Sequence, residues 1–258
     1  RRRQRGRRMK EAANSFLVAV QFMTRFPVPR GVQHSPDALA KSAVFFPVVG
    51  LLVGVGGAAL NLVLSPHMNR DVVVVLILVY LVTITGGLHE DALADAADGF
   101  GGGWEKDRVL AIMRDSRIGS FGAIAITLGM LARFVFLTNL APAKFSGFFI
   151  AGQVLGRWTA IPLAFFLPSA RESEAGQGKS IAHKISILSL VLGTAVTIAI
   201  VAAALKTAAG WTSLIAVAIA AISGLYYSRR IGGITGDCLG ATTQLTEIAV
   251  YLIGVVLP

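Results

Sequence analysis

The feature that most constrains this 258-residue chain is a series of apolar stretches, each close to the length that crosses a lipid bilayer. They are Ala38–Leu64, Val72–Leu88, Ile118–Thr138, Phe145–Leu167, Ile185–Leu205, Trp211–Tyr227 and Cys238–Leu257. A spanning helix needs about 20 mainly apolar residues. Charged residues make up only 15% of the chain, against about a quarter in soluble domains. The sequence therefore predicts an all-α, polytopic transmembrane bundle of about seven spanning helices.

A shorter stretch, Asn14–Phe26, precedes the first of these segments. It is about four helical turns long and carries Asn14, Gln21 and Arg25 on one stripe, with mostly apolar residues elsewhere. This pattern predicts an N-terminal amphipathic helix, at the membrane interface or packed beneath the bundle, that ends at Pro27. Residues 1–12 are expected to form a basic tail, and residues 13–258 a single integral membrane domain.

The distribution of positive charge predicts the orientation in the membrane. The chain has a formal net charge of +10, which fits either nucleic acid or anionic lipid as a partner. If seven segments alternate sides, the loops 1–37, 89–117, 168–184 and 228–237 hold 18 Lys and Arg, and the opposite loops hold 3. This asymmetry predicts a multi-pass protein of the cytoplasmic (inner) membrane with the first set of loops in the cytoplasm. The bilayer, and not nucleic acid, is then the expected partner of the basic residues.

An acidic stripe follows the second segment. Asp91, Asp95 and Asp98 are spaced i, i+4, i+7 and fall within about 60° of one another on a helix. Alanine and leucine separate them, and no Lys or Arg interleaves them, so a cation is expected to offset their repulsion. Oxygen ligands without His or Cys favour Mg²⁺, with Mn²⁺ or Ca²⁺ as alternative ions. Glu90 lies about 100° away and supplies another ligand or none.

The alternative interpretation of this stripe is a solvated acidic end of a helix, where Asp is favoured in the first turn. That accounts for Glu90 and Asp91 but not for Asp95 and Asp98 on the same stripe. His89 borders the acids and is kept as a candidate site residue.

Two further polar motifs lie on the same predicted face. In the run Arg114-Asp115-Ser116-Arg117, the arginines can clamp phosphate oxygens, while Asp115 and Ser116 hold them in place or cap the next helix. A positively charged flank on the cytoplasmic side explains the arginines equally well.

The second motif begins the last segment. Asp237 can cap that helix, yet Gln244 lies on its stripe, and Thr243 and Glu247 lie one turn apart inside the membrane. Polar residues within a membrane segment favour a functional site.

Together these segments resemble the cobalamin-5′-phosphate synthase (adenosylcobinamide-GDP ribazoletransferase) family. The resemblance lies in GGLHEDALADAADG from Gly86, IMRDSRIG from Ile112 and GDCLGA from Gly236. The segments 21–29 and 46–50 also resemble the start of that family, and the similarity runs in order from Ala13 onward. Ala92 stands where the family pattern often has Gly, and the Arg-rich first ten residues match no family feature.

The resemblance implies a Mg²⁺-dependent phosphoryl transfer at a pyrophosphate, a late step of vitamin B12 assembly. An oxygen of α-ribazole or of its 5′-phosphate attacks the phosphorus borne by adenosylcobinamide, and GMP leaves. Residues 13–258 would then be a catalytic domain with small-molecule substrates, with a homo-oligomer or an association with other corrinoid enzymes left open.

The implied site falls into three groups. Metal ligands would be Glu90, Asp91, Asp95 and Asp98. The base or second-metal ligand would be Asp237 or Asp115. Substrate-binding residues would be Arg25, His89, Arg114, Ser116, Arg117 and Gln244.

Two other functions remain open from the sequence. A CDP-alcohol phosphotransferase of lipid synthesis also uses spaced aspartates at a membrane edge, but its Asp-Gly-x-x-Ala-Arg run would need Arg where Asp95 stands. A cation transporter could use the acidic stripe as its ion site. Transport sites, however, lie near the bilayer midplane between broken helices, whereas these acids cluster at one face.

Overall fold

The computed structural model describes residues 2–32, 35–171 and 185–257. Their helices in chain order are α1 (Arg2–Met23), α2 (Pro36–Ser42), the 3₁₀ turn η1 (Ala43–Phe45), α3 (Phe46–Leu64), α4 (Arg70–Thr85), α5 (Leu88–Gly102), α6 (Lys106–Ile112), α7 (Ser120–Asn139), α8 (Pro142–Phe166), α10 (Ile187–Leu205), the 3₁₀ turn η2 (Lys206–Ala208), α11 (Ala209–Ile231) and α12 (Gly236–Val256). The only β-type pairing among these residues is an isolated bridge between Ser169 and Ile234. The predicted all-α class is confirmed.

Five helical stretches of the described chain are long and apolar enough to cross a membrane. They are Asp37–Leu64, Ser120–Asn139, Pro142–Phe166, Ile187–Ile231 and Gly236–Val256. The fourth holds two helices, α10 and α11, because Lys206 breaks it with a positive φ of 49°. The pair α4 and α5 passes the same test only together and is bent by 85°. With α10 and α11 counted separately and this pair counted once, the structure agrees with the predicted number of about seven.

The outer surface of the bundle is apolar. Large side chains such as Leu128 on α7, Ile198 on α10 and Ile222 on α11 are more than half exposed. Such a surface is suited to lipid tails and not to water. The chain is therefore a multi-pass membrane protein.

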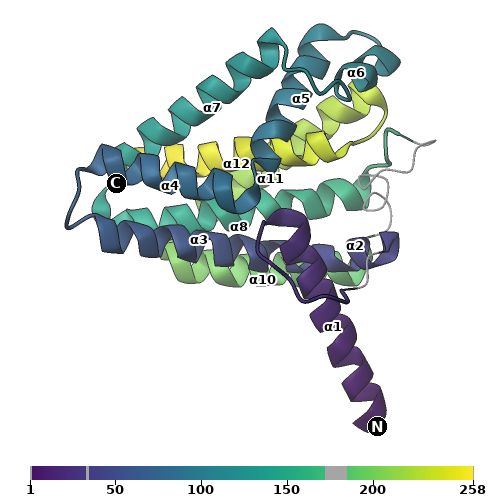
Figure 1. The fold of residues 1–258 in the computed structure, drawn as a ribbon, viewed down its shortest axis with the longest axis horizontal. Helices are drawn as coiled ribbons and strands as arrows, with labels where there is room; N and C mark the ends of the chain where they lie inside the picture. The colour runs from purple at the N-terminus through teal and green to yellow at the C-terminus, as the bar shows by residue number, and fades with distance from the viewer. Residues whose placement is uncertain (1, 33–34, 172–184, 258) are drawn as a thin grey trace.

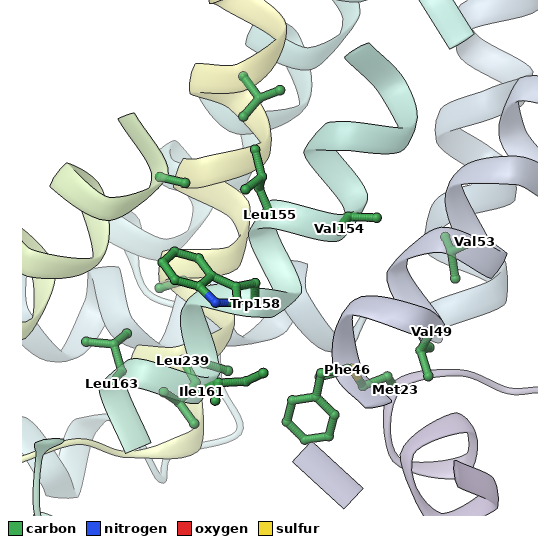
Figure 2. Packing of buried hydrophobic residues seen from close by; sticks show 14 of the residues in the cluster. Met23, Phe46, Val49, Val53, Val154, Leu155, Trp158, Ile161, Leu163 and Leu239 are labelled. Atoms are coloured by element: carbon green, nitrogen blue, oxygen red, sulfur yellow. The ribbon is translucent and has the colours of Figure 1, made fainter. Parts of the chain in front are cut away.

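The helix α8 forms the centre of the bundle and packs against α3, α10, α11 and α12. Figure 2 shows its apolar side chains, among them Val154 and Trp158, in the same cluster as Phe46 and Val53 of α3. Small residues allow the close approach, because a Cβ on Gly50 would meet the backbone of Gln153. Packing on α8 therefore fixes the relative positions of α3, α10, α11 and α12.

The polar connections gather at the two ends of the bundle. Figure 1 shows α2, α5 and α6 at one end, with the α3–α4 connection and the C-terminus at the other. At the first end Arg230 donates to the carbonyl oxygen of Gly103 at 2.7 Å. At the second end Arg70 donates to the carbonyl oxygens of Leu137 and Leu140 at 2.9 and 3.1 Å. The loops that the charge pattern assigned to the cytoplasm thus meet at one end, although residues 172–184 of loop 168–184 lie outside the described chain.

The N-terminal helix α1 differs from the predicted Asn14–Phe26 in its bounds. It begins at Arg2, inside the expected basic tail, and ends at Met23 instead of Phe26. Its last turns pack on the bundle, where Phe22 stacks on Phe46 with ring centroids 6.0 Å apart. The first turns extend away from the body of the protein (Figure 1).

A sharp bend places α5 across the start of α12. The predicted segment Val72–Leu88 is wrong at its end, because α4 stops at Thr85 and both Gly86 and Gly87 have left-handed backbone, with φ of 67° and 71°. Glycine adopts this conformation without the steric cost that a side chain brings. The chain turns there by 85°, and α5 packs closely on α12. A Cβ on Gly240 would collide with Cβ of Ala92 at this crossing.

We predict that Gly240→Ala lowers the thermal stability of the protein in detergent. The added methyl group must push α5 away from α12, which costs about 1–3 kcal/mol, as overpacking does elsewhere. The matched control is Gly210→Ala at the start of α11, where an added Cβ meets nothing within 4 Å. Both changes replace a helical Gly by Ala, so equal melting temperatures for the two variants would contradict the close crossing.

Candidate active site

Carboxylates from α5 and α12 meet at the end of the bundle where the basic loops gather. Asp91 and Asp95 lie on α5, and Asp237 is the second residue of α12. Burial, followed by the charges of Asp91, Asp237 and Asp98, raises the pKa of Asp95 to about 7. We call Asp91, Asp95 and Asp237 the acid cluster. Its members are close enough to repel one another, although they lie far apart in the sequence.

Arg171 offsets part of this negative charge. Its Nη2 donates to Oδ2 of Asp237 at 3.2 Å, and its positive charge also opposes the rise in the pKa of Asp95. The hydroxyl of Thr235 lies 3.3 Å from the same Oδ2 and accepts from the backbone N–H of Cys238, so it caps α12. Asp237 is therefore held at the first turn of α12 by contacts with Arg171 and Thr235.

Asp98 lies on the same helix but faces another group. Its Oδ2 accepts from the backbone N–H of Gly119 at 2.7 Å, and its Oδ1 from that of Gly122 at 2.8 Å. These N–H groups belong to the unpaired first turn of α7, so the buried carboxylate caps that helix. Asp98 thereby fixes the loop that holds the predicted phosphate clamp next to α5.

The predicted phosphate clamp lies in the exposed turn between α6 and α7. Arg117 pairs with Asp115, with Nη2 and Oδ2 2.6 Å apart, and this pair is open to solvent. The hydrogen bonds from Arg117 lower the pKa of Asp115 to about 2. Arg114 and Ser116 are also exposed. The clamp residues are thus accessible, but Asp115 already binds one of the two arginines.

Glu90, one residue before Asp91, points away from the acid cluster. Its Oε1 accepts from Arg133 Nη1 at 2.8 Å and from Gln244 Nε2 at 2.9 Å. Arg133 is buried on α7, so the three side chains join α5, α7 and α12. His89, the neighbour of Glu90 in the sequence, is buried. Glu90 and Gln244 are therefore brought together by the fold, on a different side of α5 from Asp91 and Asp95.

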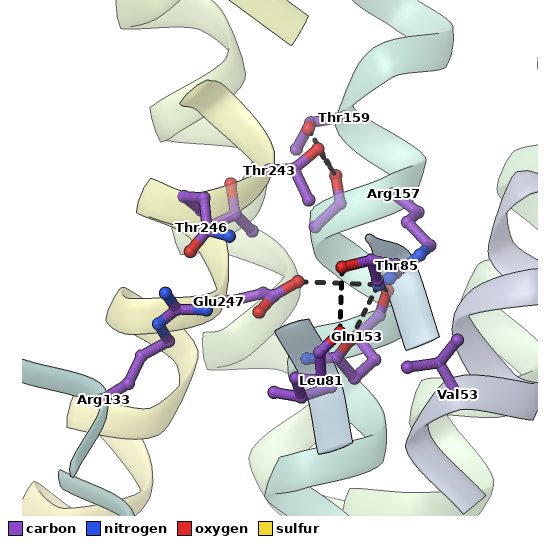
Figure 3. Close-up of polar contacts among 12 residues, drawn as sticks. Val53, Leu81, Thr85, Arg133, Gln153, Arg157, Thr159, Thr243, Thr246 and Glu247 are labelled. Carbon is purple, nitrogen blue, oxygen red and sulfur yellow. Dashed lines mark hydrogen bonds and ion pairs between the residues drawn. The ribbon is translucent and has the colours of Figure 1, made fainter. Parts of the chain in front are cut away.

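A second buried ion pair lies deeper in the bundle. Arg157 of α8 donates to Oε1 of Gln153 at 2.8 Å and lies 3.5 Å from Oε1 of Glu247 on α12. Figure 3 shows Glu247 between Arg157 and Arg133. Gln153 also donates to the hydroxyl of Tyr251 at 2.9 Å. Charges inside a membrane segment are costly unless they are paired, and here each acid has an arginine partner.

Arg25 lies at the bend between α4 and α5. Its backbone N–H donates to the carbonyl oxygen of Ile84 at 2.7 Å, and its side chain lies over Gly86 at the α4–α5 bend. Arg25 is exposed there, at the turn that leads into α5.

The donor set of the acid cluster suits a hard divalent cation. Among the described residues, no three His, Cys, Asp or Glu side chains converge on one point as a finished metal site. Asp91 and Asp95 nevertheless offer carboxylate oxygens whose repulsion a cation would relieve, and oxygen is the ligand that Mg²⁺ prefers. Asp98 and Glu90 have oxygens committed to backbone N–H groups and to Arg133. The residues that fit the ion best are therefore Asp91 and Asp95, with Asp237 beside them.

Comparison with known sequences settles the family. The profile described as cobalamin-5-phosphate synthase matches residues 15–255. The chain belongs to this family. Curated relatives named adenosylcobinamide-GDP ribazoletransferase include those of Shewanella pealeana, 36% identical over 95% of both chains, and Shewanella amazonensis, 38% identical over 92% of this chain and 93% of the relative. No solved structure matches the chain significantly.

Membership of the cobalamin-5-phosphate synthase family confirms the resemblance found in the sequence and disfavours both the lipid phosphotransferase and the transporter. The structure adds two arginines that the sequence motifs did not identify as site residues. Arg133 interrupts an apolar segment, and this signal could have identified it. Arg171 carries no such signal, because only the bridge between Ser169 and Ile234 brings it to Asp237.

We predict that Arg133→Met destabilises the protein strongly. The change leaves Glu90, whose side chain is only 12% exposed, without its cation, and removing one partner of a buried pair typically costs about 3–5 kcal/mol. Arg117→Met, the matched control, removes an arginine from the exposed pair with Asp115 and should leave the melting temperature unchanged. Thermal unfolding in detergent measures both, and equal effects would show that the Glu90–Arg133 pair does not join the helices as described.

Proposed function

We propose that this chain is an adenosylcobinamide-GDP ribazoletransferase that depends on Mg²⁺ and works at the cytoplasmic face of the membrane. It transfers the adenosylcobinamide-phosphate group to α-ribazole or its 5′-phosphate, releases GMP and forms adenosylcobalamin or its 5′-phosphate. The observation that carries the proposal is the acid cluster, in which Asp91 and Asp95 of α5 lie beside Asp237 of α12. Family membership supplies the reaction class, a transferase of cobalamin biosynthesis.

A Mg²⁺ ion held by Asp91 and Asp95 would neutralise the diphosphate and stabilise the charge that develops during displacement. The protein itself must then bind the phosphates, orient the acceptor and take up its proton. The accessible arginines of the turn between α6 and α7 are suited to hold phosphate oxygens. Asp98 supports this role because it fixes the start of α7, immediately after that turn.

The proton of the attacking hydroxyl needs a base, and the geometry favours Asp237 over Asp115. A base is most effective when its pKa lies near the working pH. The pKa of Asp115 is about 2, because Arg117 binds it, so this carboxylate is a poor proton acceptor. Asp237 is partly buried within the acid cluster. The new bond joins the acceptor oxygen to the phosphorus, and the bond to the bridging oxygen breaks as GMP leaves.

The placement at the cytoplasmic face rests on charge. The loops of the end that holds the acid cluster carry most of the Lys and Arg of the chain. Lys and Arg are retained on the cytoplasmic side of membrane proteins. A basic surface also attracts anionic substrates that carry nucleotides.

We predict that Asp95→Asn lowers the rate of GMP release by about a hundredfold or more, because it removes a carboxylate from the proposed metal site. The assay uses purified protein in detergent with adenosylcobinamide-GDP, α-ribazole 5′-phosphate and Mg²⁺. Asp107→Asn is the matched control, an exposed acid on α6 at the same end of the bundle. Wild-type protein that makes no cobalamin product with any divalent metal would overturn the proposed function.

We also predict that the Mg²⁺ concentration giving half-maximal activity rises as the pH falls below 7. The pKa of Asp95 is about 7, raised above the ordinary carboxyl value, so at pH 6 this group is mostly protonated. Proton and metal then compete for one carboxylate, and the requirement should grow by up to about tenfold per pH unit below 7 and level off above it. Titration of activity with Mg²⁺ at pH 6, 7 and 8 measures this, and an unchanged requirement would contradict it.

A further inference from the structure

Arg171 is held next to the start of α12 by backbone hydrogen bonds. The N–H of Ile234 donates to the carbonyl oxygen of Pro168, and the N–H of Ala170 donates to that of Ile234, both at 2.9 Å. A Cβ on Gly233 would collide with the carbonyl oxygen of Pro168, so the two segments lie in direct contact. The position of Arg171 is therefore set by the fold and not by a chance surface contact.

The guanidinium of Arg171 is only partly satisfied where it lies. Its Nη2 donates to Asp237, and its charge acts on Asp95. Its Nε is buried, and no hydrogen-bond partner for it is present in the described part of the chain. About a quarter of the side chain is exposed, 26% by relative area. An arginine offers five N–H donors in one plane, and such a fork suits phosphate oxygens better than a single carboxylate oxygen.

We propose that Arg171 alternates between two partners, the acid cluster in the metal-free protein and a phosphate group of the GDP-bearing substrate in the loaded enzyme. This inference rests on the proposed function. A divalent cation held by Asp91 and Asp95 and the guanidinium of Arg171 would compete for the negative charge of the acid cluster, so binding of the ion would release Arg171 from Asp237. The diphosphate that arrives with its own negative charge then becomes the preferred partner.

This role distinguishes Arg171 from the arginines that the sequence identified. Arg117 is bound by Asp115 of its own turn and is open to solvent. Arg171 already faces the carboxylates of the acid cluster from a neighbouring loop. It is therefore placed to respond to the metal and the substrate in turn.

Two measurements on Arg171→Gln test the proposal. Binding of Mn²⁺ to the substrate-free protein, followed by the electron paramagnetic resonance signal of free Mn²⁺, should become about tenfold tighter, because a competing cation is gone. The KM for adenosylcobinamide-GDP, measured by GMP release at saturating Mg²⁺, should rise about tenfold or more. Arg171→Lys keeps the charge, so its Mn²⁺ affinity should stay near wild type, while its KM rises because an ammonium lacks the fork. Arg229→Gln, an exposed arginine at the end of α11, removes the same charge nearby and should change neither value.

Loss of a purely structural arginine would not tighten Mn²⁺ binding and at the same time raise the KM for adenosylcobinamide-GDP. Unchanged or weaker Mn²⁺ binding by Arg171→Gln, or an unchanged KM, would overturn the inference while the wild-type activity still supports the proposed function. Failure of the wild type to release GMP with any divalent metal would instead remove the proposed function itself. Arg171→Lys keeps the test decisive if the Gln variant does not fold.

Discussion

The crossing of α5 over α12 is the contact on which the site depends. The left-handed glycines at 86 and 87 turn the chain by 85°, and the small residues Ala92 and Gly240 let the two helices touch. A straight continuation of α4 would carry Asp91 and Asp95 away from Asp237. The bend thus converts an acidic stripe on one helix into a cluster shared by two, at the end of the bundle where positive loops gather.

Where α5 crosses α12, neighbouring acidic residues of α5 have different partners. Asp91 belongs to the acid cluster, whereas the side chain of Glu90 contacts Arg133 and Gln244. The inner group continues to the pair of Arg157 and Glu247. These pairs join α5, α7, α8 and α12. Removing either partner of a pair would leave an uncompensated charge inside the bundle, which is costly. The acid cluster lies at the edge of this framework and retains charge that is only partly neutralised.

Much of the fold followed from the sequence, because spanning length and hydropathy specify membrane helices directly. The stripe at 91, 95 and 98 was also correctly placed on a helix. What could not be predicted depends on contacts between distant segments. The direction of Glu90 depends on Arg133, the engagement of Asp98 on the first turn of α7, and the position of Arg171 on a bridge to Ile234. Local spacing assigns residues to a face of a helix but does not say which neighbour covers that face.

We expect one divalent cation to bind where α5 and α12 cross at the end of the bundle. The most direct measurement is the position of Mn²⁺ by anomalous diffraction from crystals of the protein grown with this ion. We expect a peak bounded by the carboxylates of Asp91 and Asp95, with Asp237 beside it and Arg171 displaced from Asp237. A peak beside Glu90 or Glu247 inside the bundle, or protein that binds no ion, would contradict it.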